Sequence, residues 1–294
     1  MVMCYSIRLA HTKTYYLAIN SLTMPSSRLL ILVFLCLLFS CTSSSYGLDE
    51  EELNIVIPTE EVVNIESKVI AHRGAWLEKG LPDNSLAAFK AALGMDIYGT
   101  ECDVRQTKDG RLVICHDATY GGLTISKTDY LTLSQHTLAN GESLPLLEDF
   151  LTALHDDTGM VRMVIELKSC NVRSLLSMVD SIGVLDRVDF ISFSQGLCGQ
   201  LIAYGFGYKT FYLNGTLSPQ AARERGYCGI DYSYQVLDGY PYWINEAQEL
   251  GLQVWTWTVN GTDNIRYFLE QGVYVTTDYP SKAREIEKEL AIKH

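Results

Sequence analysis

The sequence has little positive charge. Its 294 residues include 23 Lys or Arg but 35 Asp or Glu, which gives a formal net charge of −12. There is no basic stripe that would release counterions from a phosphate backbone, and this argues against DNA or RNA as a partner. An anionic small molecule would need cations placed locally in its binding site.

The spacing of the eight cysteines fits neither disulfides nor zinc. The chain has no CxxC pair and no His at zinc-ligand spacing from a Cys, so neither a disulfide framework nor a structural zinc site is predicted. Cys102 and Cys115 each stand one position from an acidic residue or a His. We expect both to be small packing residues on the opposite face of a strand.

Nucleotide-binding motifs and long linkers are missing as well. No GxGxxG or Walker motif follows any strand-like run, and no Pro/Ser-rich stretch interrupts residues 67–294. What is present is a regular alternation of apolar strand-like runs with amphipathic helix-like runs, typical of a parallel sheet. About eight such units favour a closed (β/α)8 TIM-type barrel, formed as a single α/β domain over residues 67–294.

The N-terminal apolar run is too short to cross a bilayer. It starts after Arg28 and ends at Ser40, well below the ~20 residues that a spanning helix needs, so residues 1–41 are predicted to contain a signal peptide. Residues 1–23 are interpreted as an upstream extension from an over-called start site. "LFSC" resembles the lipobox of bacterial lipoproteins, in which a lipidated Cys41 would anchor an exported protein to a membrane of the cell envelope. A plain secretory signal is the alternative, and residues 42–66 are interpreted as a tether.

Two strand-like segments carry acidic residues at alternate positions. In "TECDVRQ", Glu101 and Asp103 share one strand face, and in "VIELK" Glu166 and Lys168 do the same. Active sites of barrels lie at the carboxyl ends of strands, where two buried carboxylates would repel each other unless a cation lay between them. Three converging carboxylates form a hard oxygen site, which favours Mg2+ or Ca2+ over zinc; solvated strand faces are the alternative.

Histidines and cations accompany these carboxylates. His72 and His116 each follow an apolar run, and two histidines on separate strands suit a general acid and a general base, although either could be a packing residue. Arg73 has a bidentate fork and Lys168 a point charge, and both suit a phosphate group. The alternative for each cation is an ion pair with the nearby carboxylates.

Taken together and in order, these motifs resemble the glycerophosphodiester phosphodiesterase family. The resemblance rests on "AHRG", "LPDNSLAAFKAAL", "TECDVRQTKDGRLVICHD", "IELK", "WTVN" and "TTDYP", from about residue 68 to 285. It implies a TIM-type barrel that uses a divalent cation to cleave glycerophosphodiesters into sn-glycerol 3-phosphate and an alcohol. By motif position, it implies acid/base roles for His72 and His116, metal binding by Glu101, Asp103 and Glu166, and substrate or phosphate binding by Arg73, Lys168, Asn84 and Trp257.

The sequence departs from the family pattern in two places. The family's "PEN" is "PDN" here, with Asp83 in place of Glu, and "ATYGGLTISK" after Asp117 lacks the Arg usual in the family. The second departure affects the leaving group more than the chemistry. It supports one alternative, a phospholipase D-like enzyme of the same fold that acts on lysophospholipids. A separate alternative is a non-catalytic surface lipoprotein that binds a phosphorylated ligand or a polyol.

Overall fold

The computed structural model describes residues 2–9, 13–20, 66–205 and 208–292. The chain divides into two compact units, Met1–Val62 and Val63–His294. In the first unit, β1 (Val2–Leu9) and β2 (Lys13–Asn20) pair antiparallel. The sequence analysis assigns no element there, although both segments are rich in the β-branched and aromatic residues that favour strands.

The predicted export signal lies outside the described residues. The apolar run, Cys41 and nearly all of the predicted tether fall between residues 21 and 65. Within the described ranges, no helix is both long enough and apolar enough to cross a membrane.

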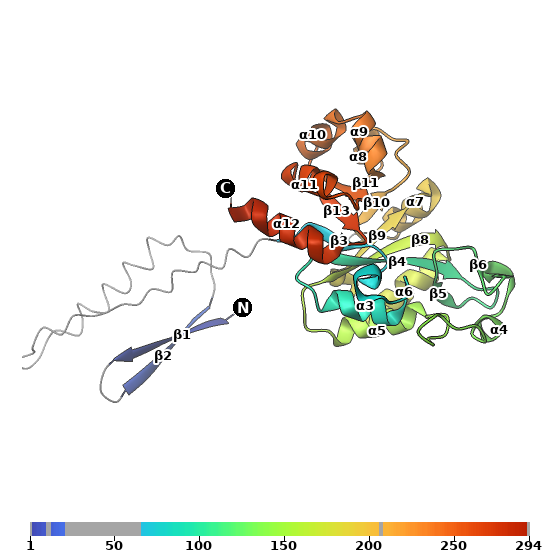
Figure 1. Ribbon diagram of the computed structural model, residues 1–294, viewed down its shortest axis with the longest axis horizontal. Helices are drawn as coiled ribbons and strands as arrows, with labels where there is room; N and C mark the ends of the chain where they lie inside the picture. The colour runs from blue at the N-terminus through green and yellow to red at the C-terminus, as the bar shows by residue number, and fades with distance from the viewer. Residues whose placement is uncertain (1, 10–12, 21–65, 206–207, 293–294) are drawn as a thin grey trace, which may run out of the picture. The chain divides into compact units, whose positions relative to one another are not determined.

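Eight parallel strands of the second unit close into a barrel, which confirms the predicted (β/α)8 fold (Figure 1). The last strand of the unit pairs with the first, and the first pairs with the second, so the ring is complete. In their order around the ring the strands are β3 (Val69–Ala71), β4 (Gly99–Gln106), β8 (Arg162–Ser169), β9 (Val188–Ser192), β10 (Thr210–Tyr212), β11 (Gly229–Ser233), β12 (Gln253–Trp257) and β13 (Tyr274–Thr277).

Helices follow most of the strands, as the periodicity predicts. Ser85 caps the second helix after β3, since its side chain accepts a hydrogen bond from the backbone N–H of Ala88 at 3.0 Å. The α-helices of this unit are α2 (Trp76–Lys79), α3 (Leu86–Leu93), α4 (Tyr130–Leu133), α5 (Leu147–Asp156), α6 (Val172–Ile182), α7 (Gln195–Tyr204), α8 (Pro219–Glu224), α9 (Tyr234–Gly239), α10 (Tyr242–Glu249), α11 (Thr262–Glu270) and α12 (Pro280–Ile292).

An excursion interrupts the barrel after β4. The carboxyl end of β4 continues past the ring and pairs antiparallel with β5 (Leu112–Ile114), and Asp109-Gly110, a typical tight-turn sequence, lies between the two strands. Beyond it, β6 (Thr119–Tyr120) pairs with β7 (Leu123–Thr124), and α4 follows. The excursion has a small core of its own, made of Val113, Ile125, Leu133 and Leu144.

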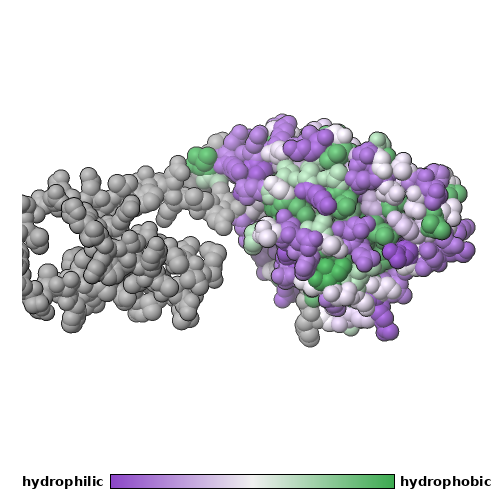
Figure 2. All heavy atoms as spheres, turned by 90° about the horizontal axis from the view of Figure 1, so that it is seen from below, coloured by the Kyte–Doolittle hydropathy of each residue, from purple (hydrophilic) through white to green (hydrophobic). Residues whose placement is uncertain are grey.

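The main core has two layers. One lies between the strands and the surrounding helices and includes Cys102, which confirms that this cysteine is a buried packing residue. The other fills the barrel interior with aromatic and aliphatic side chains such as Trp255 and Phe211, whose rings stack at 4.0 Å. On the face shown in Figure 2, exposed hydrophobic residues are interspersed with hydrophilic ones. Because the aromatic and aliphatic side chains fill the barrel interior, only the mouth of the barrel leaves room for a site.

Candidate active site

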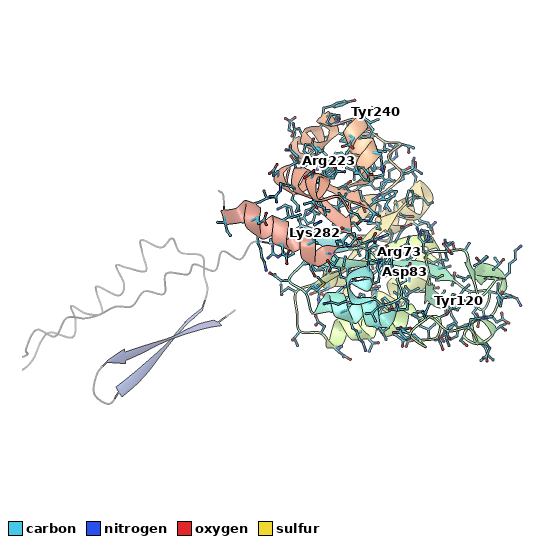
Figure 3. All side chains as sticks on the ribbon, viewed as in Figure 1. Arg73, Asp83, Tyr120, Arg223, Tyr240 and Lys282 are labelled. Carbon is cyan, nitrogen blue, oxygen red and sulfur yellow. The ribbon has the colours of Figure 1, made fainter. Side chains whose placement is uncertain are left out.

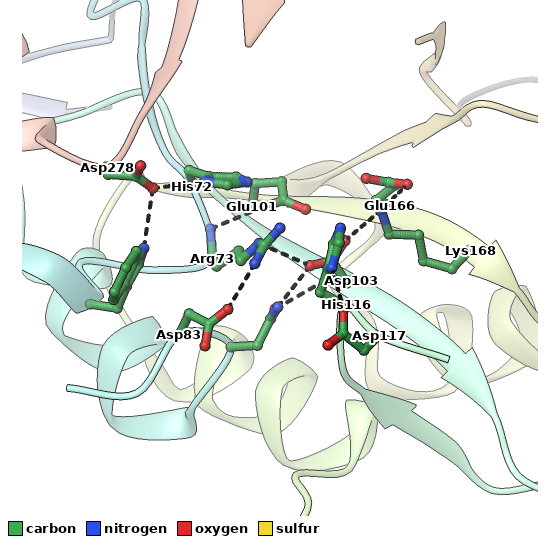
Figure 4. A network of polar contacts seen from close by, with 12 residues as sticks. His72, Arg73, Asp83, Glu101, Asp103, His116, Asp117, Glu166, Lys168 and Asp278 are labelled. Carbon is green, nitrogen blue, oxygen red and sulfur yellow. Dashed lines mark hydrogen bonds and ion pairs between the residues drawn. The ribbon is translucent and has the colours of Figure 1, made fainter. Parts of the chain in front are cut away.

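Three carboxylates from two neighbouring strands meet at the barrel mouth (Figure 4). Glu101 and Asp103 lie on β4, and Glu166 on β8 stands opposite Asp103 in the parallel register. All three side chains are buried, and one ligand atom from each lies within 4.8 Å of the others. This agrees with the sequence argument that both pairs of alternating residues point to the same face of the sheet.

The three carboxylates repel one another, and this repulsion affects their pKa values. Burial, together with the charges of Asp103 and Glu166, raises the pKa of Glu101 well above its ordinary value. Burial and the charge of Asp103 likewise raise the pKa of Glu166. Burial also disfavours ionised Asp103, but Lys168, Asn84 and Arg73 outweigh it and lower its pKa. Full ionisation of all three carboxylates would therefore place more negative charge here than Lys168 and Arg73 neutralise.

These residues fit a divalent cation. The donor set consists of hard carboxylate oxygens from three buried side chains, which suits Mg2+ or Ca2+. A bound cation would remove the repulsion that raises the pKa of Glu101 and Glu166.

Two positively charged side chains, Lys168 and Arg73, lie beside the carboxylates. Lys168 Nζ lies 2.7 Å from Glu166 Oε1 and 3.2 Å from Asp103 Oδ1, and Arg73 Nε lies 3.5 Å from Asp103 Oδ2. Both ion-pair alternatives of the sequence analysis are thus present in this structure. Both side chains still line the cavity, so they remain placed to receive an anionic ligand.

The turn after β3 directs Arg73 toward the site. Arg73 has a positive φ of 54°, and its backbone N–H donates to Glu101 Oε2 at 2.9 Å. Gly74 follows with φ of 85°, where a Cβ atom would lie 2.6 Å from the backbone carbon of Ala88. Only glycine allows this close approach of the turn to α3, which explains why Gly follows the His-Arg pair.

The Pro82-Asp83-Asn84 segment forms hydrogen bonds with Arg73 and Asp103. The Asn84 side chain donates to Asp103 Oδ2 at 2.7 Å and accepts from the Asp103 backbone N–H at 3.2 Å. Asp83 accepts a hydrogen bond from Arg73 Nη1 at 2.9 Å. The structure therefore assigns Asn84 a positioning contact with a carboxylate, while the phosphate contact predicted for it remains a prediction.

His72 stands in a dense polar network beside the carboxylates. Its Nδ1 lies 2.7 Å from Asp278 Oδ1, and Asp278 also accepts hydrogen bonds from Trp76 Nε1 at 3.2 Å and Asn260 Nδ2 at 2.7 Å. Burial raises the pKa of Asp278, but the hydrogen bonds from His72 and Asn260 outweigh it, and the net shift is downward. An ionised Asp278 orients the ring of His72.

Asp278 was not among the predicted site residues. It belongs to the "TTDYP" motif, so the signal was present in the sequence as an acidic residue at the end of the last barrel strand. The pairing with His72 spans 206 positions and depends on closure of the barrel, which brings β13 next to β3.

His116 reaches the mouth from the excursion. It follows β5, and its backbone carbonyl accepts hydrogen bonds from the Arg105 side chain on β4. Its Nδ1 lies 2.9 Å from Asp117 Oδ1, and both side chains are more exposed than their counterparts at His72. The two predicted acid/base residues therefore lie at one site in different surroundings.

One cavity of about 130 Å³ brings eight of the nine predicted site residues together. It contains His72, His116, Arg73, Lys168, Glu101, Asp103, Glu166 and Trp257. Asn84 instead lines a second cavity of about 230 Å³, and Arg73 and His116 border both cavities. Figure 3 shows Arg73 and Asp83 beside each other and Tyr120, another residue of the second cavity, farther along the excursion.

Two further side chains of the first cavity escaped sequence reasoning. Phe193, after β9, packs edge-on against Trp257 with ring centroids 5.4 Å apart, and Lys168 Nζ lies 5.7 Å from its ring. Asp231, on β11, is buried in the barrel wall and lines the same cavity. Neither stands in a motif that marks it out from an ordinary strand residue.

Comparison with known proteins identifies the family. A model of the glycerophosphoryl diester phosphodiesterase family matches residues 72–282. A probable glycerophosphodiester phosphodiesterase 2 of Mycobacterium tuberculosis is 33% identical over 145 residues, which cover 47% of this chain and 53% of that protein. A glycerophosphodiester phosphodiesterase of Caldanaerobacter subterraneus is 27% identical over 240 residues, or 74% of this chain and 96% of that one.

Solved structures give the same result. A glycerophosphodiester phosphodiesterase from Parabacteroides distasonis has 34% identity and a TM-score of 0.74, and the match covers 77% of this chain and 98% of that one. A phosphodiesterase from Oleispira antarctica, 22% identical with a TM-score of 0.67, shares the fold over 75% of this chain and 96% of its own. The predicted enzyme class is confirmed, and the chain belongs to the glycerophosphoryl diester phosphodiesterase family.

Proposed function

We propose that the protein hydrolyses glycerophosphodiesters to sn-glycerol 3-phosphate and an alcohol, with a divalent cation bound by Glu101, Asp103 and Glu166. The observation that carries the proposal is the single cavity in which these carboxylates, two cations and two histidines meet. The Oleispira antarctica phosphodiesterase of the same fold was solved in complex with the product sn-glycerol-3-phosphate, which supports this ligand class.

Arg73 and Lys168 bind the phosphate. In this structure both side chains pair with carboxylates, and a bound phosphate would take over part of this pairing. Mg2+ or Ca2+ would supply Lewis-acid stabilisation of negative charge on the phosphate. The fork of Arg73 and the ammonium group of Lys168 then stabilise the charge that develops in the transition state.

His72 and His116 transfer the protons. One removes a proton from the attacking hydroxyl, which is the glycerol 2-hydroxyl or a water, and the other protonates the departing alcohol. Attack by the glycerol hydroxyl would benefit from proximity and form a cyclic phosphate that water opens afterwards. Asp278 holds His72 through Nδ1, so Nε2 of that ring is the atom free to exchange the proton.

The second cavity receives the leaving alcohol in this proposal. Arg73 and His116 border both cavities, and this supports a scissile bond that lies between the two cavities. The second cavity is lined by the segment after Asp117 in which the sequence departs from the family pattern, including Thr119 and Tyr120. Preference for one alcohol over another would therefore be determined by the excursion.

A product assay with defined substrates tests the function. Purified protein is offered glycerophosphocholine, glycerophosphoethanolamine or lysophosphatidylcholine with Mg2+, Ca2+ or EDTA. Glycerol 3-phosphate is measured for the first two substrates, and lysophosphatidic acid and choline are measured for the third. We expect release from the first two substrates, abolished by EDTA and restored by one of the cations. Turnover of the lysolipid alone would establish the phospholipase D-like alternative, and no turnover of any substrate would favour a binding protein.

Matched variants distinguish the site from the rest of the surface. Glu166→Gln removes one carboxylate charge at nearly constant shape. It should abolish most of the activity, and added cation should no longer restore it. His155→Ala serves as the control for the histidine variants, because His155 is an exposed residue of α5 outside both cavities. Activity of the control should equal that of the unmodified protein.

We also propose that the protein is exported and anchored to a membrane of the bacterial cell envelope through Cys41. The support is the sequence alone: a short apolar run that ends in "LFSC", followed by an acidic segment. Expression in a bacterial host with labelled palmitate tests it. We expect label in the membrane fraction, and loss of label with Cys41→Ser; a soluble unlabelled protein would indicate a plain secretory signal instead.

A further inference from the structure

One buried carboxyl in the first cavity has no part in the chemistry proposed above. Asp231 is 1% exposed and lines the cavity, and its Oδ1 has no hydrogen-bond partner in the described part of the chain. A buried polar atom without a partner is unfavourable, and native proteins satisfy nearly all such groups. This atom therefore points to a partner that arrives from outside the chain.

Asp231 stands across the barrel from the metal ligands. Around the ring of eight strands, β11 is four places from β4, and four places is half the circumference. The phosphate-binding cations and the carboxylates come from the side of β3, β4 and β8. On the way from β8 to β11 the cavity is lined by Ile191, Phe193 and Leu213, whose side chains form no hydrogen bonds.

The two cavities determine which half of the substrate faces Asp231. With the phosphate at the boundary formed by Arg73 and His116, the leaving alcohol occupies the second cavity. The glycerol half then lies in the first cavity, toward the wall that contains β11. Its terminal hydroxyl is both a donor and an acceptor, as an unpartnered carboxyl requires.

Given the proposed function, on which this step rests, we propose that Asp231 is a substrate-binding residue that hydrogen-bonds the terminal hydroxyl of glycerol. It thereby selects glycerophosphodiesters over diesters that lack this hydroxyl. A site built to bind a hydroxyl discriminates strongly against the analogue without it, because the buried group is then left unpaired.

The surroundings of Asp231 support binding of a hydroxyl over binding of a metal. The three clustered ligand atoms belong to Glu101, Asp103 and Glu166, and Asp231 is not among them. Its backbone carbonyl accepts a hydrogen bond from Trp257 Nε1 at 2.9 Å, so the position of the residue is fixed relative to the cavity wall. Burial and the charge of Glu166 raise the pKa of Asp231 well above its ordinary value, and a neutral acid does not repel a phosphate.

Substrate pairs test the inference directly. Kinetics are compared for glycerophosphocholine and for 1,2-propanediol phosphocholine, which keeps the hydroxyl next to the phosphate-bearing carbon but lacks the terminal one. The full chain should prefer the glycerol compound by about 10–10²-fold in kcat/KM. Asp231→Ala should lose this preference by slowing the glycerol compound alone. Asp231→Asn, which can still hydrogen-bond, should keep most of the preference.

Binding and stability measurements keep the test independent of turnover. Calorimetry with sn-glycerol 3-phosphate and propanediol phosphate, at constant Mg2+, should show the same preference and its loss in Asp231→Ala even if the protein hydrolyses neither diester. That result would contradict the proposed function but support this inference. Removal of an unpartnered buried carboxyl should also raise Tm, by about 2–4 °C for a domain of this size.

The control and the contrary outcomes are specific. Ser233→Ala alters the next residue on the same face of β11 and should leave the preference unchanged within about twofold, the scale of an ordinary surface substitution. An equal loss of both substrates in Asp231→Ala, or no preference in the unmodified protein, would overturn the inference. So would a lower Tm together with an equal loss of binding for both phosphates, since this would indicate a structural role.

Discussion

The two histidines of the site lie in opposite kinds of surroundings. His72 is 20% exposed and paired with Asp278, which is 15% exposed, whereas His116 is 41% exposed and paired with Asp117, which is 75% exposed. Asp278 also accepts hydrogen bonds from Trp76 and Asn260. The Asp117 side chain pairs with His116 (Figure 4). The first histidine belongs to the barrel, and the second belongs to the excursion that interrupts it.

This difference suggests a division of labour. The barrel side positions its proton-transfer group through a buried hydrogen-bonded network, which is costly to disturb because each member satisfies another. The excursion side uses a looser group next to the second cavity, where alcohols of different shape would have to fit. We therefore predict that His116 is the histidine that protonates the leaving alcohol, because an alcohol bound in the second cavity would help to position it.

The largest effects are expected when either histidine is removed. His72→Ala and His116→Ala should each lower kcat by about 10²–10⁴-fold, the usual contribution of one acid/base group. The two variants should differ with a p-nitrophenyl diester, whose leaving group needs no proton. We expect that substrate to recover most of the activity of His116→Ala and little of that of His72→Ala. Steady-state kinetics with both substrates measure the difference, and equal recovery would contradict the division of labour.

Substitution of the two aspartates that pair with the histidines should show the same contrast, with a smaller loss of kcat. Asp278→Asn removes a charge-assisted hydrogen bond from His72 in a partly buried network, so kcat should fall by about 10–10²-fold. Asp117→Asn changes an exposed pair and should cost less than about threefold, because exposed ion pairs contribute little. The pH dependence of kcat distinguishes positioning from folding, since only Asp278→Asn should shift it. Equal effects of the two substitutions would remove the contrast.

The sequence predicted the barrel side of the site more completely than the excursion side. Glu101, Asp103, Glu166 and Lys168 were predictable because strand periodicity alone fixes which residues share a face. The partner of His72 was not, because Asp278 meets it only when β13 closes on β3. Asp231 was missed for a related reason: an isolated Asp in a strand says nothing until the ring places it opposite β4. The excursion was predictable as far as its β4–β5 hairpin, but not the cavity that it builds.

Cation binding should link the stability of the site to pH. Burial and neighbouring charge raise the pKa of Glu166 from an ordinary 4.5 to about 7 and also raise that of Glu101, while Asp103 stays ionised. Without a cation, the contribution of the two glutamates to stability is then greatest below pH 4.5, and it is lost as pH rises through about 7. Added Mg2+ or Ca2+ should therefore raise Tm more above this window than below it. Thermal melts at both ends of the window check this, with Glu166→Gln as the control that reduces the effect.

The smallest effect is expected at Asp83, which stands where the family pattern has Glu and which contacts Arg73. Asp83 accepts a hydrogen bond from Arg73 Nη1, and its side chain is 43% exposed, so much of this interaction is screened by solvent. Asp83→Glu restores the family residue and lengthens the side chain by one methylene, which the exposed position can accommodate. kcat/KM for glycerophosphocholine should change by less than about threefold, whereas Arg73→Lys, which removes the fork, should cost about 10–10²-fold. A large effect of Asp83→Glu would mean that the shorter acid positions Arg73 for a substrate of different shape, which would move specificity from the excursion to the barrel.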